Sequence, residues 1–254
     1  MAVITVFNQK GGVGKTTSTL NLAFALALLK KNPCALDLDP QGHLTLACGV
    51  KGVSGEDSVF SFFSQDKPLD QLVRTLPAGL SLIPASLDLS KIDALYAGNP
   101  SITTKLREGL RDKLRQNGVP ILIDCCPMLG VLTLNALIAA DRVLIPVAAD
   151  FLSLQGVQRL DTALNVLETK LKRKFERRVI VTRFDSRRRL SFEIYDILKK
   201  HFGGQLCEAR ISENVSLAAS PMHGKSIFAF APHSPGAKDY RALTEELWNS
   251  GFLG

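Results

Sequence analysis

The sequence is poor in cysteine and has none of the cysteine spacings that hold metal. Its five cysteines are an odd number, and no two of them form a CxxC pair. A disulfide framework and a structural zinc site both need paired, regularly spaced cysteines. The sequence therefore predicts neither, and it favours a reducing cytoplasm.

Long apolar runs are also missing. The longest obvious one, Leu22–Leu29, suits a core helix and is too short to cross a bilayer. The apolar segment Ala2–Phe7 is short and leads directly into a glycine-rich turn, so it predicts a strand and no signal peptide. A hydrophobic content of 46% and a charged content of 22% are typical of a soluble globular protein. We expect one α/β domain over residues 1–254.

Motifs that read nucleic-acid bases are absent, but a basic segment is present. There is no helix-turn-helix or zinc-finger spacing, and aromatic residues are not interleaved with the basic ones. Between Lys170 and Lys200, twelve basic residues face four acidic ones, a net +8 in a chain whose total is +7. A solvated basic face would explain this in an arbitrary protein, but the density also suits a phosphate backbone. DNA binding would then be sequence-independent and salt-sensitive, through Arg173, Lys174, Arg177, Arg178, Arg187, Arg188 and Arg189.

The glycine-rich turn is Lys10–Thr17, between the predicted strand and an apolar helix. Its three glycines leave the backbone N–H groups open to phosphate oxygens, and the N-terminus of the helix adds partial positive charge. This context predicts a P-loop, in which Lys15 reaches the β- and γ-phosphates and the hydroxyl of Thr16 ligates Mg²⁺. The predicted nucleotide-binding residues are Lys10, Gly11, Gly12, Val13, Gly14, Lys15, Thr16 and Thr17.

The turn departs from the usual P-loop pattern at Gln9, where the first glycine would fall. The run Lys10–Thr17 instead resembles the deviant Walker A motif of the ParA/Soj/MinD group of P-loop ATPases. The resemblance to the ParA/Soj branch extends over nearly the whole chain. It implies ATP and Mg²⁺ as cofactors and a homodimer formed with ATP. It also implies that Lys10 is the signature lysine, which reaches the nucleotide of the partner subunit.

Carboxylates follow two predicted strands, Asp37 and Asp39 after one and Asp124 after another. Ligand groups gather at the carboxyl ends of parallel strands, so these side chains suit a metal–phosphate centre. Asp39-Pro40 alone would equally indicate a turn. The resemblance implies that Asp39 orients the attacking water and that Asp37 supports the Mg²⁺ shell. The predicted catalytic residues are Lys10, Lys15 and Asp39, and the predicted metal residues are Thr16, Asp37 and Asp124.

Two further segments resemble the family but depart from it. The segment Cys125–Gly130 resembles the switch segment of the family, but Cys126 stands where a proline is typical, so the backbone lacks a fixed φ there. In the segment Ser212–Pro221, the family carries arginines before and after an Asn-Val pair, and Glu213 and Ser216 occupy those places. We therefore expect the DNA surface at Arg173–Arg189. By the same resemblance, Asn214 lies close to the adenine pocket.

These observations predict an α/β fold, a doubly wound, mostly parallel sheet flanked by helices, of the P-loop NTPase type with a deviant Walker A motif. The resemblance implies an ATPase that dimerises with ATP, binds DNA non-specifically and partitions or positions a cargo. The cargo would be a plasmid, a chromosome region or a large protein assembly. A ParB-like or other adaptor protein would stimulate hydrolysis. The protein would be cytoplasmic and nucleoid-associated, with no membrane partner.

Two alternatives remain open at this point. A MinD-like membrane-surface ATPase needs a basic amphipathic helix at its C-terminus, and Leu247–Gly254 contains no Lys or Arg. An ATP-driven reductase related to nitrogenase iron protein needs two well-separated cysteines for an iron–sulfur cluster. Cys125 and Cys126 are adjacent, and no second cysteine follows at a convincing place.

Overall fold

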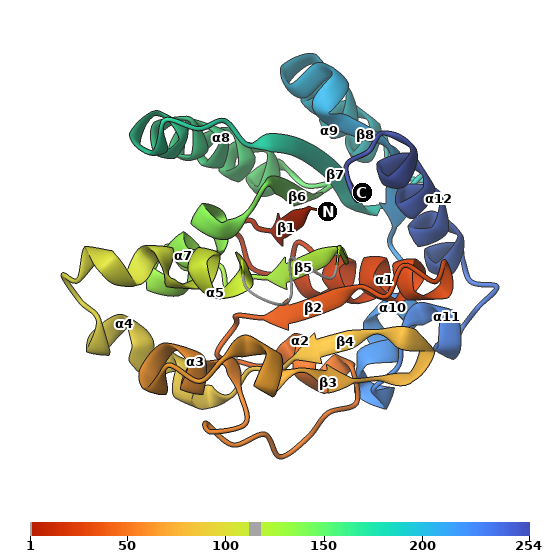
Figure 1. Ribbon diagram of the computed structural model, residues 1–254. Coiled ribbons are helices and arrows are strands. Elements are labelled where there is room, and N and C mark those ends of the chain that lie inside the picture. Colours follow the sequence, from red (N-terminus) through yellow and green to blue (C-terminus); the bar gives the residue numbers. More distant parts are fainter. Residues whose placement is uncertain (1, 112–117) are drawn as a thin grey trace.

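The computed structural model describes residues 2–111 and 118–254. These residues form an eight-stranded sheet with the order β3-β4-β2-β5-β1-β6-β7-β8 (Figure 1). Every neighbouring pair is parallel except β3 and β4 at one edge. The strands are β1 (Val3–Val6), β2 (Cys34–Asp37), β3 (Arg74–Thr75), β4 (Ser81–Ile83), β5 (Ile121–Asp124), β6 (Arg142–Ala148), β7 (Glu176–Phe184) and β8 (Leu206–Ser212).

Helices cover both faces of the sheet (Figure 1). One layer contains α1 (Lys15–Leu28), α2 (His43–Ala47), α10 (Val215–Ala219), α11 (Ile227–Phe230) and α12 (Pro235–Asn249). The other contains α3 (Val59–Gln65), α4 (Ile92–Leu95), α5 (Lys105–Arg111), α7 (Val131–Ala139), α8 (Phe151–Leu171) and α9 (Arg189–Phe202). Short 3₁₀ turns are η1 (Leu69–Leu72), η2 (Pro77–Gly79), η3 (Leu87–Lys91), η4 (Pro100–Thr104), η5 (Gly203–Gln205) and η6 (Ser220–His223).

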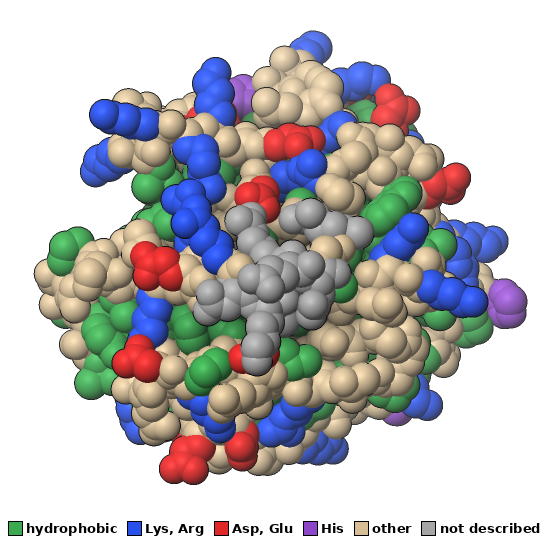
Figure 2. Space-filling view, in the orientation of Figure 1, with side chains coloured by type: hydrophobic (Ala, Val, Ile, Leu, Met, Phe, Trp, Pro, Cys, Tyr) green, Lys and Arg blue, Asp and Glu red, His purple; other side chains and the backbone are tan. Residues whose placement is uncertain are grey.

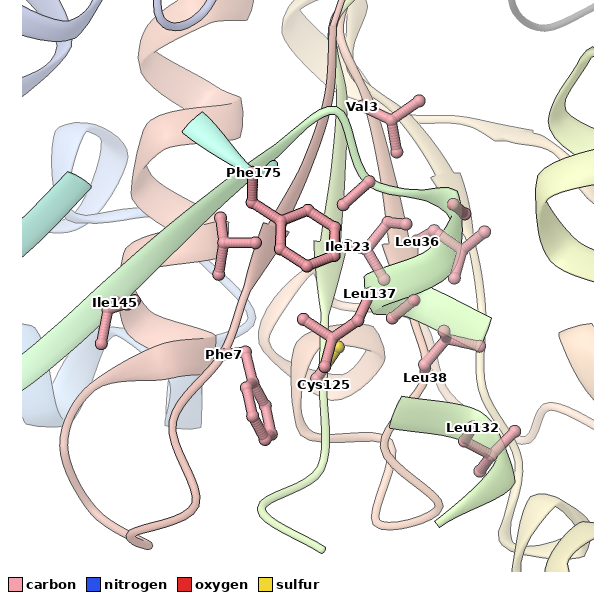
Figure 3. Packing of buried hydrophobic residues seen from close by; sticks show 14 of the residues in the cluster. Val3, Phe7, Leu36, Leu38, Ile123, Cys125, Leu132, Leu137, Ile145 and Phe175 are labelled. Atoms are coloured by element: carbon pink, nitrogen blue, oxygen red, sulfur yellow. The ribbon is translucent and has the colours of Figure 1, made fainter. Parts of the chain in front are cut away.

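The central strands are apolar along their whole length because both of their faces are covered. All four residues of β1, β2 and β5 are buried. Successive side chains enter opposite cores: Val3 packs in the core under α7 and α8, and Ile4 packs in the core under α1 and α12. Figure 3 shows the first of these cores, with Val3, Phe7 and Ile123 around a common interior. This packing fixes the carboxyl edge of the sheet, where the site lies.

The predicted fold class is confirmed. The predicted strand at Ala2–Phe7 is β1, and the predicted apolar helix is the C-terminal part of α1, which already begins at Lys15 and ends at Leu28. The edge strand β8 was not predicted, because Glu208 and Arg210 interrupt its apolar residues. Within residues 2–111 and 118–254, no helix combines the length and the apolar character that crossing a membrane requires.

Candidate nucleotide site

The carboxyl ends of three central strands bring the predicted site residues together. Val6 at the end of β1 is in register with Asp124 at the end of β5, and Asp124 is in register with Asp37 at the end of β2. The glycine-rich turn follows β1 directly. The carboxylates of β2 and β5 therefore lie on one flank of the turn, and β6, β7 and β8 lie on the other.

The turn has the backbone of a phosphate loop. Gly12 and Gly14 have φ values of 73° and 89°, in the left-handed region that favours glycine. A Cβ on Gly11 or Gly12 would occupy open space, with no atom within 4 Å. Gly14 is the N-cap of α1 and supplies no side-chain cap, so the first N–H groups of α1 are available to an anion. This cradle fits a phosphate chain.

Lys15 lies inside the loop. Its side chain is buried, and its ammonium donates a hydrogen bond to the carbonyl oxygen of Lys10 at 3.1 Å. Burial lowers the pKa of Lys15, and the charge of Asp124 works in the opposite direction. A phosphate chain in the cradle would therefore favour the charged ammonium.

Asp124 fits a magnesium site. Its side chain is fully buried, and its Oδ1 accepts a hydrogen bond from the hydroxyl of Thr19 at 3.3 Å. The hydroxyl of Thr16 lies near the same carboxylate and works to lower its pKa. Its Oδ2 has no hydrogen-bond partner among the described residues. Burial, and then the charge of Asp37, raise the pKa of Asp124 well above its usual range. A hard cation beside Thr16 and Asp124 would satisfy the free oxygen and favour the carboxylate.

Asp37 accepts hydrogen bonds from its own loop with both carboxylate oxygens, and its part in the Mg²⁺ shell stays a prediction. Its Oδ2 accepts hydrogen bonds from the backbone N–H and the hydroxyl of Thr45, at 2.8 and 2.7 Å. Its Oδ1 accepts one from the N–H of Asp39 at 3.1 Å. Burial raises the pKa of Asp37 to about 6, and its bonds with Thr45 and Asp39 oppose that rise. Asp37 therefore positions the loop that carries Asp39.

Asp39 combines the two interpretations that its sequence allows. Its Oδ1 accepts a hydrogen bond from the N–H of Gln41 at 2.9 Å, which makes the turn expected of Asp-Pro. The same carboxylate lies close enough to raise the pKa of Lys15. A carboxylate fixed by a turn beside the phosphate loop can orient a water molecule there, and that role stays a prediction.

Lys10 lies at the rim of the site. Its ammonium donates hydrogen bonds to Asp150 Oδ1 at 2.7 Å and to Ser153 Oγ at 2.8 Å. Burial works against the charged form of Asp150, yet the hydrogen bonds from Lys10 and Ser153 hold its pKa below the usual range. Asp150 is the N-cap of α8. Sequence reasoning missed Asp150 and Ser153, although an Asp between a strand and a helix is an N-cap signal.

Asn214 has a structural role as the N-cap of α10. Its Oδ1 accepts hydrogen bonds from the N–H groups of Ser216 and Leu217, at 2.8 and 3.3 Å. The amide nitrogen remains for a ligand, so contact between Asn214 and adenine stays a prediction.

The switch segment is tied down despite the missing proline. The hydroxyl of Thr133 donates to the carbonyl of Met128 at 2.6 Å, and the sulfur of Cys126 lies 3.5 Å from the same hydroxyl. Cys125 is fully buried and packs near Phe7 and Leu137 (Figure 3). A cluster shared across a subunit interface needs exposed cysteines, so this position disfavours the iron-protein alternative.

The predicted DNA-binding residues fall into two groups at opposite ends of β7. The strand has nine residues, so its ends are about 30 Å apart. Arg187, Arg188 and Arg189 follow its carboxyl end, on the edge that carries the nucleotide loop. Their side chains are 86%, 74% and 92% exposed and form ion pairs with Asp185 and Glu193.

The group at the amino end of β7 mostly stabilises the fold. Arg177 is only 7% exposed and pairs with Asp161 at 2.5 Å and Glu168 at 2.8 Å, so its prediction as a DNA contact is wrong. Arg173 stacks on Phe175 and donates to two carbonyl groups of α7. Lys174 is exposed, and Arg178 donates to the carbonyl of Gly204. On the face shown in Figure 2, Lys and Arg side chains gather over α8.

Comparison with known proteins supports the nucleotide site. A family model described as an AAA domain matches residues 1–177. The sporulation initiation inhibitor protein Soj of Bacillus subtilis is 34% identical over 98% of this chain and 99% of its own length. The chromosome-partitioning ATPase Soj of Thermus thermophilus is 41% identical over 96% of this chain and 94% of its own length.

A solved structure supports the cofactors. Cobyrinic acid a,c-diamide synthase from Mycobacterium smegmatis, with a bound ATP analogue and magnesium, is 27% identical to this chain with a TM-score of 0.83. The match covers 100% of this chain and 98% of that one. ATP and Mg²⁺, predicted from the phosphate loop and the carboxylates, are the cofactors that this site takes.

Proposed function

Because this chain belongs to the ParA/Soj family of P-loop ATPases, we propose that it dimerises with ATP, binds DNA without sequence preference, and partitions or positions a cargo. The reaction is the hydrolysis of ATP to ADP and phosphate. Residues 1–254 act as one domain, which the continuous sheet supports. The protein works in the cytoplasm, on the nucleoid.

The observation that carries this proposal is the different placement of two lysines. Lys15 is buried in the phosphate loop, where it can bind the phosphates of its own nucleotide. Lys10 is at the rim, its side chain 31% exposed and held by an exchangeable ion pair with Asp150. A lysine that bound only the nucleotide of its own subunit would be expected inside the phosphate loop, as Lys15 is, and not at its rim. In the dimer, the ammonium of Lys10 contacts the phosphates bound by the partner subunit.

Catalysis rests on positioning and charge. Mg²⁺, when bound, would supply positive charge against the charge that develops during phosphoryl transfer. Thr16 and Asp124 hold the metal, and Lys15 binds the oxygens of the β- and γ-phosphates. Asp39 orients the attacking water, and Asp37 keeps the loop of Asp39 in place through Thr45.

DNA binding uses Arg187, Arg188 and Arg189. These side chains are exposed at the nucleotide edge of the sheet, and their ion pairs with Asp185 and Glu193 are exposed enough to exchange for phosphates. A DNA surface on this edge would lie close to the dimer contact made by Lys10, so ATP would control both. A ParB-like adaptor that stimulates hydrolysis would release the dimer and the DNA together. The chromosome-partitioning relative supports a DNA cargo.

The membrane-surface alternative receives less support from the packing of the last residues. Phe252 and Leu253 are fully buried. Arg142 stacks on the ring of Phe252 and donates a hydrogen bond to the carbonyl of Gly254 at 2.9 Å. A segment anchored in this way does not present an apolar face to a lipid surface.

The proposal is tested by the oligomeric state with and without ATP, measured by analytical ultracentrifugation. The wild-type chain should dimerise with Mg²⁺ and ATP. Lys15→Ala should lose ATP binding and the dimer. Lys10→Ala should retain ATP binding, because its side chain does not enter its own loop, and lose the dimer. If Lys10→Ala dimerises and hydrolyses ATP normally, the shared site is wrong.

A further inference from the structure

Arg183 has an unusual backbone conformation for an arginine. It is the second-last residue of β7 and has a φ of 52°, in the left-handed region that bulky residues rarely occupy. The pairing between β7 and β8 shifts register at this place, between Val181–Arg210 and Phe184–Ser212. Irregularities of this kind turn a side chain in a new direction and are common beside functional sites.

Arg183 directly follows a residue that contacts the phosphate loop. The hydroxyl of Thr182 donates to the carbonyl of Val13 at 2.8 Å. The side chain of Thr182 also lies 3.7 Å from the position that a Cβ would take on Gly14. Arg183 therefore emerges at the rim of the loop, and its side chain is 59% exposed.

Glu213 holds the guanidinium of Arg183 with both carboxylate oxygens. The distances are 3.0 Å from Nε to Oε2 and 3.4 Å from Nη2 to Oε1. The N–H of Glu213 donates to the carbonyl of Phe184 at 3.1 Å, which fastens the loop after β8 to the end of β7. The hydrogen bond and charge of Glu213 raise the pKa of Arg183, and Asp150 adds to the rise. The guanidinium of Arg183 is thus a planar cation whose orientation is held by Glu213.

The nucleoside of a bound nucleotide should extend toward this pair. The carboxylates Asp37 and Asp124 lie on the β2 and β5 side of β1, so the metal and the reacting phosphates belong to that side. The other side of β1 contains β6, then β7, then β8. Neighbouring strands are about 4.8 Å apart, so the ends of β7 and β8 lie about 10 and 14 Å from β1, a span that a ribose and a purine ring can cover.

We propose that Arg183 is a nucleotide-binding residue whose planar guanidinium stacks on the purine ring, with Glu213 as the residue that positions it. Guanidinium groups stack on aromatic faces, whereas a lysine ammonium has no plane to stack. This inference rests on the proposed ATPase and adds a base contact that the phosphate loop does not provide.

The test compares two ligands by isothermal titration calorimetry: ATP, which carries the base, and inorganic tripolyphosphate, which does not, both with Mg²⁺. Arg183→Gln should weaken ATP binding about tenfold and leave tripolyphosphate binding unchanged. Arg183→Lys should stay as weak as Arg183→Gln. Glu213→Gln should weaken ATP binding by a smaller factor, about threefold, because the guanidinium remains but is less well held. Arg159→Gln, which changes an exposed arginine of α8, is the matched control.

The outcomes separate the possible errors. Equal weakening of both ligands by Arg183→Gln would mean a disturbed phosphate loop, and it would overturn the stacking role. So would unchanged ATP binding, or full recovery in Arg183→Lys, which would assign charge alone. If Glu213→Gln binds ATP like the wild type, Glu213 has no positioning role. A wild-type chain that binds neither ligand would instead contradict the proposed ATPase.

Discussion

The two ends of β7 use the same residue type for opposite purposes. At the amino end, Arg177 is buried between two carboxylates of α8. At the carboxyl end, Arg187 and Arg188 are exposed and share the single carboxylate of Asp185. Both ends belong to one basic stretch of the sequence. The difference shows that burial, rather than charge density along the chain, decides which arginines are available to a polyanion.

The cause of the difference is what packs on each end. α8 ends above the amino end of β7, and its residues Asp161 and Glu168 face inward there. A buried guanidinium without a counter-charge is costly, so these two carboxylates hold Arg177 in place. No comparable layer covers the described residues that follow Phe184, whose arginine side chains stay exposed. Ion pairs on the exposed end are worth little individually and can exchange with solvent or with a ligand.

The largest expected effect is at the buried end. Arg177→Met should lower the free energy of unfolding by about 3 kcal/mol, because it removes a buried guanidinium and leaves the partly buried Asp161 and Glu168 without their counter-charge. Urea unfolding followed by circular dichroism measures this. The control is Arg178→Met, whose guanidinium bonds to the carbonyl of Gly204, and which should cost about 1 kcal/mol or less. Equal destabilisation of the two variants would contradict the contrast between buried and exposed arginines.

The next effect concerns DNA. Reversing the charges of Arg187, Arg188 and Arg189 to Glu should weaken binding of ATP-bound protein to random-sequence DNA by about a hundredfold at low salt. The slope of log affinity against log salt should fall by about 0.9 for each phosphate that the variant no longer neutralises. Filter binding over a salt series measures both quantities.

Lys174 provides the matched comparison for that experiment. It is exposed at the amino end of β7, about 30 Å from the nucleotide edge along the strand. Lys174→Glu should change the affinity much less than a reversal at Arg188. If Lys174→Glu has an equal effect, the DNA surface includes the amino end after all, and the two ends differ in structure but not in function.

The sequence could predict the nucleotide loop because its parts are local. Glycines, Lys15 and the start of α1 are consecutive in the chain, and the motif alone determines their arrangement. Asp124 was also predictable, because the end of an apolar strand in a parallel sheet points to the ligand edge.

The rest depended on interactions between distant segments. The ion pair of Arg177 joins β7 to α8, and the bond of Asp37 joins β2 to Thr45, which in turn accepts a hydrogen bond from the N–H of Ala85. The partner of Lys10, Asp150, lies 140 residues away. Spacing in the sequence cannot show which carboxylates pair with which arginines, and that pairing is what removed Arg177 from the exposed basic surface.

The smallest expected effect tests whether an exposed ion pair at the carboxyl edge of the sheet, Lys10–Asp150, can exchange. If Lys10 must leave Asp150 to reach the partner's nucleotide, removing the carboxylate should tighten the ATP-dependent dimer about twofold to fivefold, which is the value of an exposed ion pair. Asp150→Asn is the suitable variant, because asparagine still caps α8. Dissociation constants from sedimentation measure the change.

A control separates the ion pair from the local structure. Ser153→Ala removes the second acceptor of Lys10 but keeps the backbone N–H that Asp150 caps, so it should tighten the dimer less than Asp150→Asn. A weaker dimer in Asp150→Asn would mean that the carboxylate still orients Lys10 after the subunits meet. The ion pair of Lys10 and Asp150 would then be as fixed as the pairs of Arg177. A pair that persists both in the monomer and in the ATP-bound dimer is not exchanged when the nucleotide binds.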